Sequence, residues 1–280
     1  QVNSSMQNPI YFDSHMHTPL CKHAVGEPFE YAEAGRKAGL KGIIMTCHSP
    51  MPKEFSSDVR MSIDQFPYYV QLVEQTRQKY EGNLEVLLGI ESDWFPGMED
   101  WLIELHEKAD FHYIIGSVHP FVQEYKTQFN NGNPLVFQKG YFNDLADAAE
   151  TQLFDCISHP DVVKNMFPLE WDFSKLRDTV DDCLNRIKGC GTAMELNTSG
   201  LNKSYPEMNP SKEMLAMMKE HNIPIVVSSD SHTPKRVGAD FDKGLKCLKE
   251  VGYDKVSHFK ERKRIDLNIQ DVAKSMGFSI

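Results

Sequence analysis

The sequence predicts an α/β barrel in which residues 1–280 form a single domain. Short apolar runs alternate with helix-like segments along the whole chain, and this alternation is typical of parallel α/β folds. Seven of the apolar runs end within a residue or two of a histidine or an acid. Such side chains at every strand end favour a closed or nearly closed barrel, because an open sheet gathers its ligands at one switch point.

Each expected strand is a short apolar run, as buried parallel strands require. Together the strands present imidazole and carboxylate groups on one rim of the barrel, which describes a site for more than one metal ion. In chain order, the runs and the side chains that follow them are 10–11 with Asp13, His15 and His17, 42–45 with His48, 86–90 with Glu91, 113–118 with His119, 154–157 with His159, 193–194 with Glu195, and 225–227 with Asp230 and His232.

Helices are expected between the strands where apolar residues recur every three or four positions. This spacing is found in residues 66–73, 98–109, 174–187 and 211–218. Asp64 is the expected N-cap of the first of these helices, and Ser211 is expected to begin the last. Gly189 is the expected stop of the helix that follows Ser174.

Three connections, residues 49–61, 120–140 and 198–210, are longer than a barrel requires, and each follows a strand end that bears a candidate ligand. Long loops of this kind in compact domains are usually functional or disordered. The second predicts an ordered lid, because disordered tracts are poor in aromatic residues. Its aromatic residues are Phe121, Tyr125, Phe129 and Phe137.

The net charge of −10 argues against a surface that binds nucleic acid. An acidic protein can still bind an anionic substrate if metal ions supply positive charge.

No apolar run is long enough for a membrane helix, and no secretory signal is recognised, so a membrane partner is not expected. The six cysteines lack zinc-finger spacing and are expected to be reduced thiols in the cytoplasm. Residues 1–5, before Met6, are expected to be a remnant foreign to the fold.

The residue types at the strand ends point to metal chemistry. His15 and His17 stand two positions apart, so both imidazoles lie on one side of an extended chain and can grip one ion. Asp230 and His232 repeat this spacing on the last strand. Glu91 can bridge two ions through its two oxygens, which a neutral histidine cannot do. Mixed histidine and carboxylate ligands without cysteine suit Zn, Mn or Fe.

Each candidate ligand can also have a purely structural role. A single histidine at a strand end is more often a hydrogen-bonded structural residue, and only the set as a whole favours metal binding. Asp13 is expected to orient a ligand histidine, and Glu195 is either part of the rim site or a buried ion-pair partner. Cys21 and Cys47 are interpreted as packing residues. The histidines outside the pattern are expected on the surface or in packing; they are His106, His112, His221 and His258.

The same residues resemble the motifs of the PHP (polymerase and histidinol phosphatase) superfamily from Tyr11 to about Gly238. Residues 195–201 are similar to the stand-alone histidinol-phosphate phosphatases of that family. The motifs, in order, are 13–17 (DSHMH), 21–26 (CKHAVG), 46–50 (TCHSP), Glu91, 117–119 (SVH), 157–160 (ISHP) and 229–232 (SDSH).

The resemblance implies a distorted (β/α)₇ barrel, similar to a TIM barrel, with a centre of three divalent metal ions. It assigns His15, His17, Glu91 and Asp230 to the first ion. It assigns Glu91, His119 and His159 to the second ion, and His23, His48 and His232 to the third. Many members of the family have an acid where this chain has Cys47. This difference leaves two roles open for His48, a ligand of the third ion or a contact to the phosphate.

The activity that the resemblance implies is that of a metal-dependent phosphomonoesterase. Its expected substrate is L-histidinol phosphate, a small-molecule ester of histidine biosynthesis. Glu91 and Asp230 are the expected catalytic residues: a hydroxide shared by the first two ions attacks phosphorus, and Asp230 or a metal-bound water protonates the leaving alkoxide. Two alternatives stay open. One is a phosphoesterase for nucleotides or another small phosphate ester, and the other is a metal-binding regulatory module without turnover.

Basic residues near the rim are candidates for binding the phosphate. Lys164 lies just beyond His159, and Arg60 ends the loop after His48; Lys203 and Arg236 are weaker candidates. Any one of them can equally be a solvated surface charge. The aromatic residues of the 120–140 segment are expected to stack on the substrate imidazole. The substrate amine needs an acid, and the candidates are Glu54, Asp58, Asp93, Glu124 and Glu207.

Overall fold

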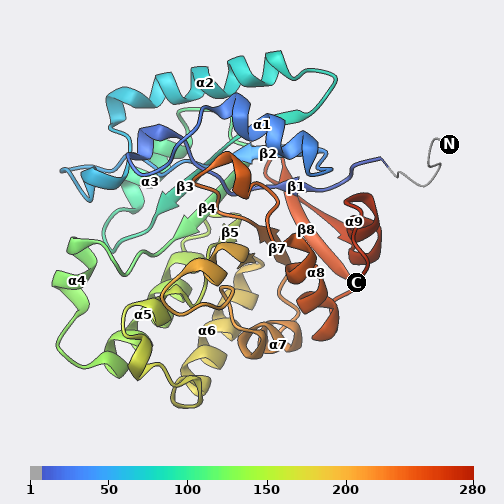
Figure 1. Cartoon of the computed structure of the whole chain (residues 1–280). Coiled ribbons are helices and arrows are strands. Elements are labelled where there is room, and N and C mark those ends of the chain that lie inside the picture. Colours follow the sequence, from blue (N-terminus) through green and yellow to red (C-terminus); the bar gives the residue numbers. More distant parts are fainter. Residues whose placement is uncertain (1–7) are drawn as a thin grey trace.

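Seven parallel strands form one sheet in the order β1-β2-β3-β4-β5-β6-β7, and the helices surround it (Figure 1). The structure is a computed structural model that describes residues 8–280. The predicted α/β barrel of seven strands is confirmed. The strands are β1 (Phe12–Asp13), β2 (Gly42–Met45), β3 (Glu85–Asp93), β4 (Tyr113–Ser117), β5 (Cys156–Ile157), β6 (Ala193–Asn197) and β7 (Ile225–Ser228). The expected remnant at residues 1–5 lies outside the described residues.

The seam between β1 and β7 is closed by a few hydrogen bonds rather than by a strand ladder. Just beyond the two strands, the Ser231 N–H donates to the His15 carbonyl (3.1 Å) and the His17 N–H donates to the Ser231 carbonyl (3.0 Å). Closer to the amino-terminal ends, the Val227 N–H donates to the Tyr11 hydroxyl over 3.0 Å. This pairing keeps residues 15–17 extended beside the end of β7.

Most connections between the strands contain helices, and none of the helices in residues 8–280 is long and apolar enough to cross a membrane. The helices are α1 (Pro28–Lys37), α2 (Phe66–Lys79), α3 (Glu99–His106), α4 (Gln123–Phe129), α5 (Pro134–Glu150), α6 (Arg177–Cys190), α7 (Lys212–Glu220), α8 (Phe241–Glu250) and α9 (Ile269–Ser275). The four segments with helical spacing correspond to α2, α3, α6 and α7.

The predicted helix ends are partly correct. Ser211 caps α7 as expected, because its side chain accepts a hydrogen bond from the Met214 N–H. Asp64 is not the cap of α2; it lies in a 3₁₀ turn that leads into the helix, and Gln65 is the N-cap. Gly189 lies inside α6, which ends at Cys190 and is capped by Gly191 with a φ of 72°. The left-handed conformation at this position favours glycine, and this explains why the helix stops there.

The predicted lid at residues 120–140 is instead largely helical. Tyr125 and Phe129 are one helical turn apart in α4, with ring centroids 4.5 Å apart. Asn133 caps α5, and Pro134 occupies its first turn. Tyr125 and Phe137 are each only 1% exposed, so these rings form part of the core. Tyr125 and Phe137 therefore reflect packing, which the sequence pattern alone did not distinguish from a lid, whereas Phe121 is 40% exposed.

An antiparallel hairpin near the carboxyl terminus was not anticipated. It consists of β8 (Lys255–Lys260) and β9 (Lys263–Asn268) and covers the amino-terminal ends of the barrel strands. Phe259 of the hairpin stacks on Tyr113 at the start of β4, with ring centroids 5.2 Å apart. These residues belong to an apolar cluster to which every barrel strand contributes, here called the basal cluster: Phe12, Ile44, Leu87, Tyr113, Ile115, Cys156, Ala193, Val226 and Phe259.

Candidate metal centre

The closed seam brings the candidate ligands of the first and last strands together. His15 and His17 follow β1, and Asp230 follows β7. The Asp230 Oδ1 atom lies 2.8 Å from His17 Nε2 and 3.2 Å from His15 Nε2. The Asp230 Oδ2 atom accepts a hydrogen bond from Asn197 Nδ2 over 3.0 Å. Asn197 thus fixes the carboxylate that faces both imidazoles.

Glu91 lies near the end of β3 and is 1% exposed. Its Oε1 atom lies 3.0 Å from His15 Nε2 and 3.4 Å from His17 Nε2. Its Oε2 atom lies 3.2 Å from His119 Nε2 and 3.6 Å from His159 Nε2. The two oxygens therefore face two different groups of imidazoles, which is the arrangement that a carboxylate bridging two cations needs.

His23 and His232 form a pair of imidazoles that face each other at the edge of the centre. Their Nε2 atoms are 3.1 Å apart. The Nδ1 atoms lie 2.8 Å from the Cys21 carbonyl and 3.0 Å from the Asp230 carbonyl, respectively. Carbonyl oxygens only accept hydrogen bonds, so both Nδ1 atoms donate and both Nε2 atoms carry lone pairs. Two lone pairs at this distance fit a cation between them.

Two carboxylates contact histidines through the ring nitrogen that points away from the centre. The His15 Nδ1 atom lies 2.5 Å from Glu195 Oε2, and the His119 Nδ1 atom lies 2.5 Å from Asp93 Oδ1. A carboxylate on the far nitrogen is common for metal-binding histidines, because it fixes the tautomer and the ring orientation. Of the two roles expected for Glu195, these contacts favour the ion-pair partner. Asp13, expected to orient a ligand ring, instead accepts from the His15 backbone N–H at 3.4 Å.

The buried carboxylates of this centre favour positive charge on the groups beside them. Burial by itself lowers the pKa of a histidine, yet Asp230 raises the pKa of His17 to about 9. Asp93 and Glu91 likewise raise the pKa of buried His119 to about 10. Burial lowers the pKa of His232 to about 3, so this imidazole stays neutral and keeps its lone pair. Such a centre binds cations in competition with protons.

The predicted ligand residues converge at the carboxyl-terminal rim, although their grouping differs in part from the expected one. Donor atoms of the set expected for the first ion lie within 4.8 Å of one another. Within residues 8–280, His48 does not form such a set with both His23 and His232, and His159, expected at the second ion, belongs to none of the sets. The sets are His15, His17, Glu91 and Asp230; His48, Glu91 and His119; His17, His48 and His232; His17, Cys21 and Cys47; and Cys21, His23 and His232. The ligand roles themselves remain predictions.

The basic residues expected to bind phosphate lie in different environments. Lys164 is fully buried, and its Nζ atom contacts Asp161 (3.0 Å), Glu207 (2.7 Å) and the Met208 carbonyl (2.8 Å). Arg60 is also buried, against Asp93. Arg236 pairs with Asp240 over 3.0 Å, and Lys203 is partly exposed after β6.

The candidate acids for the substrate amine also differ. Asp93 and Glu207 are occupied by Arg60 and Lys164, respectively. Glu124 accepts a hydrogen bond from the Ser56 N–H over 2.9 Å. Glu54 and Asp58 are exposed in the connection between β2 and α2.

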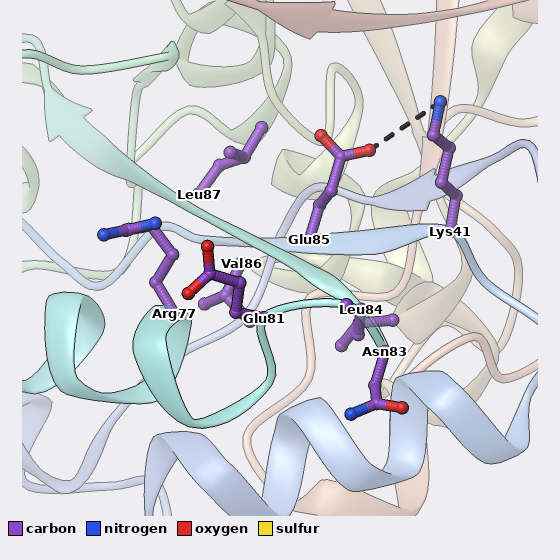
Figure 2. Close-up of a pocket in the computed structure, with 9 residues that line it drawn as sticks. Lys41, Arg77, Glu81, Asn83, Leu84, Glu85, Val86 and Leu87 are labelled. Atoms are coloured by element: carbon purple, nitrogen blue, oxygen red, sulfur yellow. Dashed lines mark ion pairs between the residues drawn. The ribbon is translucent and has the colours of Figure 1, made fainter.

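A separate hollow of about 410 Å³ lies between the end of α2 and the start of β3 (Figure 2). The charged residues that line it include Lys41, Arg77 and Glu85. Lys41 pairs with Glu85 over 3.7 Å, and Arg77 pairs with Glu74 over 2.6 Å. Figure 2 shows no cluster of imidazoles here, so this hollow lacks the chemistry of the rim.

A comparison with known families agrees with this geometry. Residues 13–199 match the model of the PHP domain. The chain belongs to the PHP domain family. Most of the histidines and acids of the rim fall within the matched residues, and Asp230 and His232 lie beyond them.

Relatives of this PHP chain are named for one activity. It is 36% identical over 261 residues to a Deinococcus radiodurans protein named "Probable histidinol-phosphatase", covering 90% of this chain and 97% of that one. It is 24% identical to the Bacillus subtilis protein named "Histidinol-phosphatase", covering 82% of this chain and 96% of that one.

A solved structure shares the fold of this PHP chain. It is a histidinol phosphate phosphatase from Lactococcus lactis subsp. lactis, complexed with Zn, L-histidinol and phosphate. The TM-score is 0.77 at 18% identity, with 91% of this chain and 98% of that chain covered. At this identity the likeness shows the fold.

Two supporting residues of the PHP site were missed as such from the sequence. Asp93 was considered only as a partner for the substrate amine, and Asn197 was not considered. Each follows a rim acid by two positions on the same strand, Asp93 after Glu91 and Asn197 after Glu195. Residues two apart on a strand share a face, so this spacing is the signal that could have identified both.

Proposed function

We propose that this chain is a phosphomonoesterase that hydrolyses L-histidinol phosphate to L-histidinol and phosphate in histidine biosynthesis. The observation that best supports a metal-dependent reaction is Glu91, whose two oxygens face two groups of imidazoles. The relatives supply the substrate, because proteins matched over nearly their whole length are named histidinol-phosphatase. A cytoplasmic location belongs to the same proposal, since all six cysteines are free thiols.

The proposed cofactor is a set of three divalent ions, Zn, Mn or Fe. Zinc is favoured among them because the Lactococcus relative is complexed with Zn. His15, His17, Glu91 and Asp230 would hold the first ion, and Glu91, His119 and His159 the second. His23 and His232 would hold the third. Its further ligand would be Cys21, whose Sγ atom forms a set with both imidazoles, or His48, which forms a set with His232 but not with His23. When bound, such ions activate water as a nucleophile and neutralise charge on a phosphate.

Asp230 is proposed to be an ionised ligand of the first metal ion. Burial by itself raises the pKa of its carboxyl group, but His15 and His17 hold that pKa well below its usual range. The group therefore stays ionised at neutral pH and accepts hydrogen bonds from Asn197 and His17. An ionised Asp230 would hold the first ion through Oδ1, the oxygen that faces both imidazoles.

The substrate imidazole and amine have fewer candidate partners than the sequence suggested. Phe121 is 40% exposed and stands two residues after His119, whereas Tyr125 and Phe137 are buried. We therefore assign stacking of the imidazole to Phe121. For the amine, Glu54 and Asp58 remain exposed in the connection that follows His48.

The test is phosphate release by the purified protein from histidinol phosphate, p-nitrophenyl phosphate and nucleotides, before and after chelation and readdition of Zn or Mn. We expect kcat/KM for histidinol phosphate to exceed that for the other esters by at least ~100-fold, the scale that a few polar contacts provide. Equal or faster turnover of a nucleotide would overturn the histidinol assignment and leave a metal phosphoesterase. Activity that survives complete removal of metal would overturn the metal centre.

A further inference from the structure

Arg60 has an environment that a phosphate ligand would not have. Its side chain is 2% exposed, and it lies in the connection between β2 and α2, directly after the 3₁₀ turn Ser57–Val59. We infer that Arg60 is a positioning residue of the metal centre, which acts on His119 through Asp93, and that it does not bind the phosphate. This inference rests on the proposed metal centre but not on the identity of the substrate.

Each of the three guanidinium nitrogens of Arg60 already has a hydrogen-bond or ion-pair partner. Its Nη1 atom donates to the Ser49 carbonyl over 2.8 Å. Its Nε atom donates to the Ser56 carbonyl over 3.2 Å, and its Nη2 atom donates to the Ser56 hydroxyl over 2.8 Å. The Nη2 atom also forms an ion pair with Asp93 Oδ2. Arginine binds phosphate best through two parallel N–H groups, and this side chain offers no such free pair.

Asp93 connects Arg60 to the centre. Its side chain is 3% exposed, and its two oxygens have different partners: Oδ2 faces Arg60, and Oδ1 lies 2.5 Å from His119 Nδ1. On the other side of its ring, His119 Nε2 points at Glu91 Oε2 over 3.2 Å. The result is a continuous series of contacts, Arg60 to Asp93 to His119 to Glu91. Asp93 can hold the imidazole in one orientation because Arg60 holds Asp93.

The same arginine also fixes the backbone next to another rim histidine. Ser49 directly follows His48, and its carbonyl accepts from Arg60. The Ser49 N–H donates to the Glu91 carbonyl over 2.9 Å, and the Ser49 hydroxyl accepts from the Asp93 N–H over 3.2 Å. Arg60 therefore joins the later part of this connection to its beginning and to β3. Buried charged groups with several hydrogen-bond partners hold such local geometry rigidly.

The experiment compares R60M and D93N with wild type, and uses R36M as the matched control. Arg36 pairs with Glu33 on the exposed face of α1, so R36M removes an arginine–glutamate pair outside the site. Zinc affinity is measured by competition with a chromophoric chelator, and kcat and KM are measured at saturating zinc. We expect R60M and D93N to weaken the binding of one equivalent of zinc by about 10–100-fold, as loss of a ligand's supporting partner does. KM at saturating zinc should change by less than about threefold.

Further variants keep the test decisive. R60K retains the charge but loses the planar fork, and we expect it to lose zinc affinity less than R60M does. The double variant R60M/D93N should lose little more zinc affinity than either single variant, because both interrupt one series of contacts. Unchanged zinc affinity in R60M, with a KM raised more than about tenfold, would overturn the inference and restore Arg60 as a phosphate ligand. Zinc affinity can be read without any turnover, so failure of the histidinol assignment would be seen separately.

Discussion

The two ends of this barrel bury opposite kinds of side chain. At the carboxyl-terminal rim, histidines and acids such as His15, Glu91 and Asp230 lie together in the interior. At the other end, the hairpin β8–β9 covers the apolar basal cluster. Burying apolar surface stabilises a fold, whereas burying charged groups costs free energy unless they are paired or bind metal. The basal end therefore supplies stability, and the rim depends on its counter-ions.

The same division can be followed along a single strand. Glu85 begins β3, and Glu91 lies near its carboxyl-terminal end. Glu85 is 31% exposed and is paired with Lys41 (Figure 2). It is also paired with Lys260. Glu91 is 1% exposed and is surrounded by histidines. Two glutamates on one strand thus have different roles because they lie at different ends of the barrel.

The largest expected effect follows from changing Glu91→Gln. The variant keeps the shape of the side chain but loses the charge that faces both groups of imidazoles. We expect kcat/KM to fall by about 10³-fold or more, corresponding to roughly 4 kcal/mol of transition-state stabilisation, with loss of bound metal. Enzyme kinetics and metal analysis check this. Glu85→Gln is the matched control and should retain both activity and metal; wild-type metal content in Glu91→Gln would contradict the bridging role.

Phe259→Ala tests the basal end. Removing this ring leaves a cavity beneath Tyr113, and we expect the free energy of unfolding to fall by about 3–5 kcal/mol. Denaturation in urea measures this change. The folded fraction should bind metal and turn over substrate as wild type does. If the variant lost metal affinity without losing stability, the proposed separation between the two ends would be incorrect.

Removing the metal tests the dependence of the rim on counter-ions. A metal that binds only the folded state stabilises it by about 2.7 kcal/mol when its free concentration is 100 times Kd. Chelation should therefore lower the Tm of the wild type, and readdition of zinc should restore it. Phe259→Ala should show the same decrease on chelation, since the two ends act independently. A Tm that does not respond to chelation would show that the centre holds no stabilising ion.

The smallest expected effect concerns His258 of the hairpin, which is stacked on Phe12 with centroids 4.7 Å apart. Burial lowers the pKa of His258 to about 4. The unfolded state, with a pKa near 6.5, then binds the proton more tightly, so stability is lost as pH falls from about 6.5 to 4. This group should account for about 2 kcal/mol of that loss by pH 5. His258→Phe should lack this part of the pH dependence in unfolding measurements made on chelated protein; identical pH profiles would contradict the assignment.

The sequence by itself determined the barrel and the rim. An apolar run followed directly by His15 and His17, or by Glu91, is a local pattern, and in a parallel barrel every such pattern ends at the same rim. The helices α2, α3, α6 and α7 were predicted for the same reason, since their periodicity is contained in the segment itself. The exact ends of these helices were harder to predict, as Asp64 and Gly189 show. In both cases a neighbouring residue could also begin or end the helix, and the structure uses that residue instead.

The tertiary structure decided which charged side chains are available to bind a ligand. Arg60 and Lys164 look like phosphate ligands in the sequence, but in the fold they are neutralised by Asp93 and by Asp161 with Glu207. Most of these partners are separated from them by more than thirty residues, and no local pattern encodes such pairs. The hairpin β8–β9 was missed for a related reason, since its Phe259 packs against Tyr113 of a strand far away in the sequence. Local periodicity defines elements and strand ends, whereas pairing of buried charges and rings depends on contacts that only the folded chain brings together.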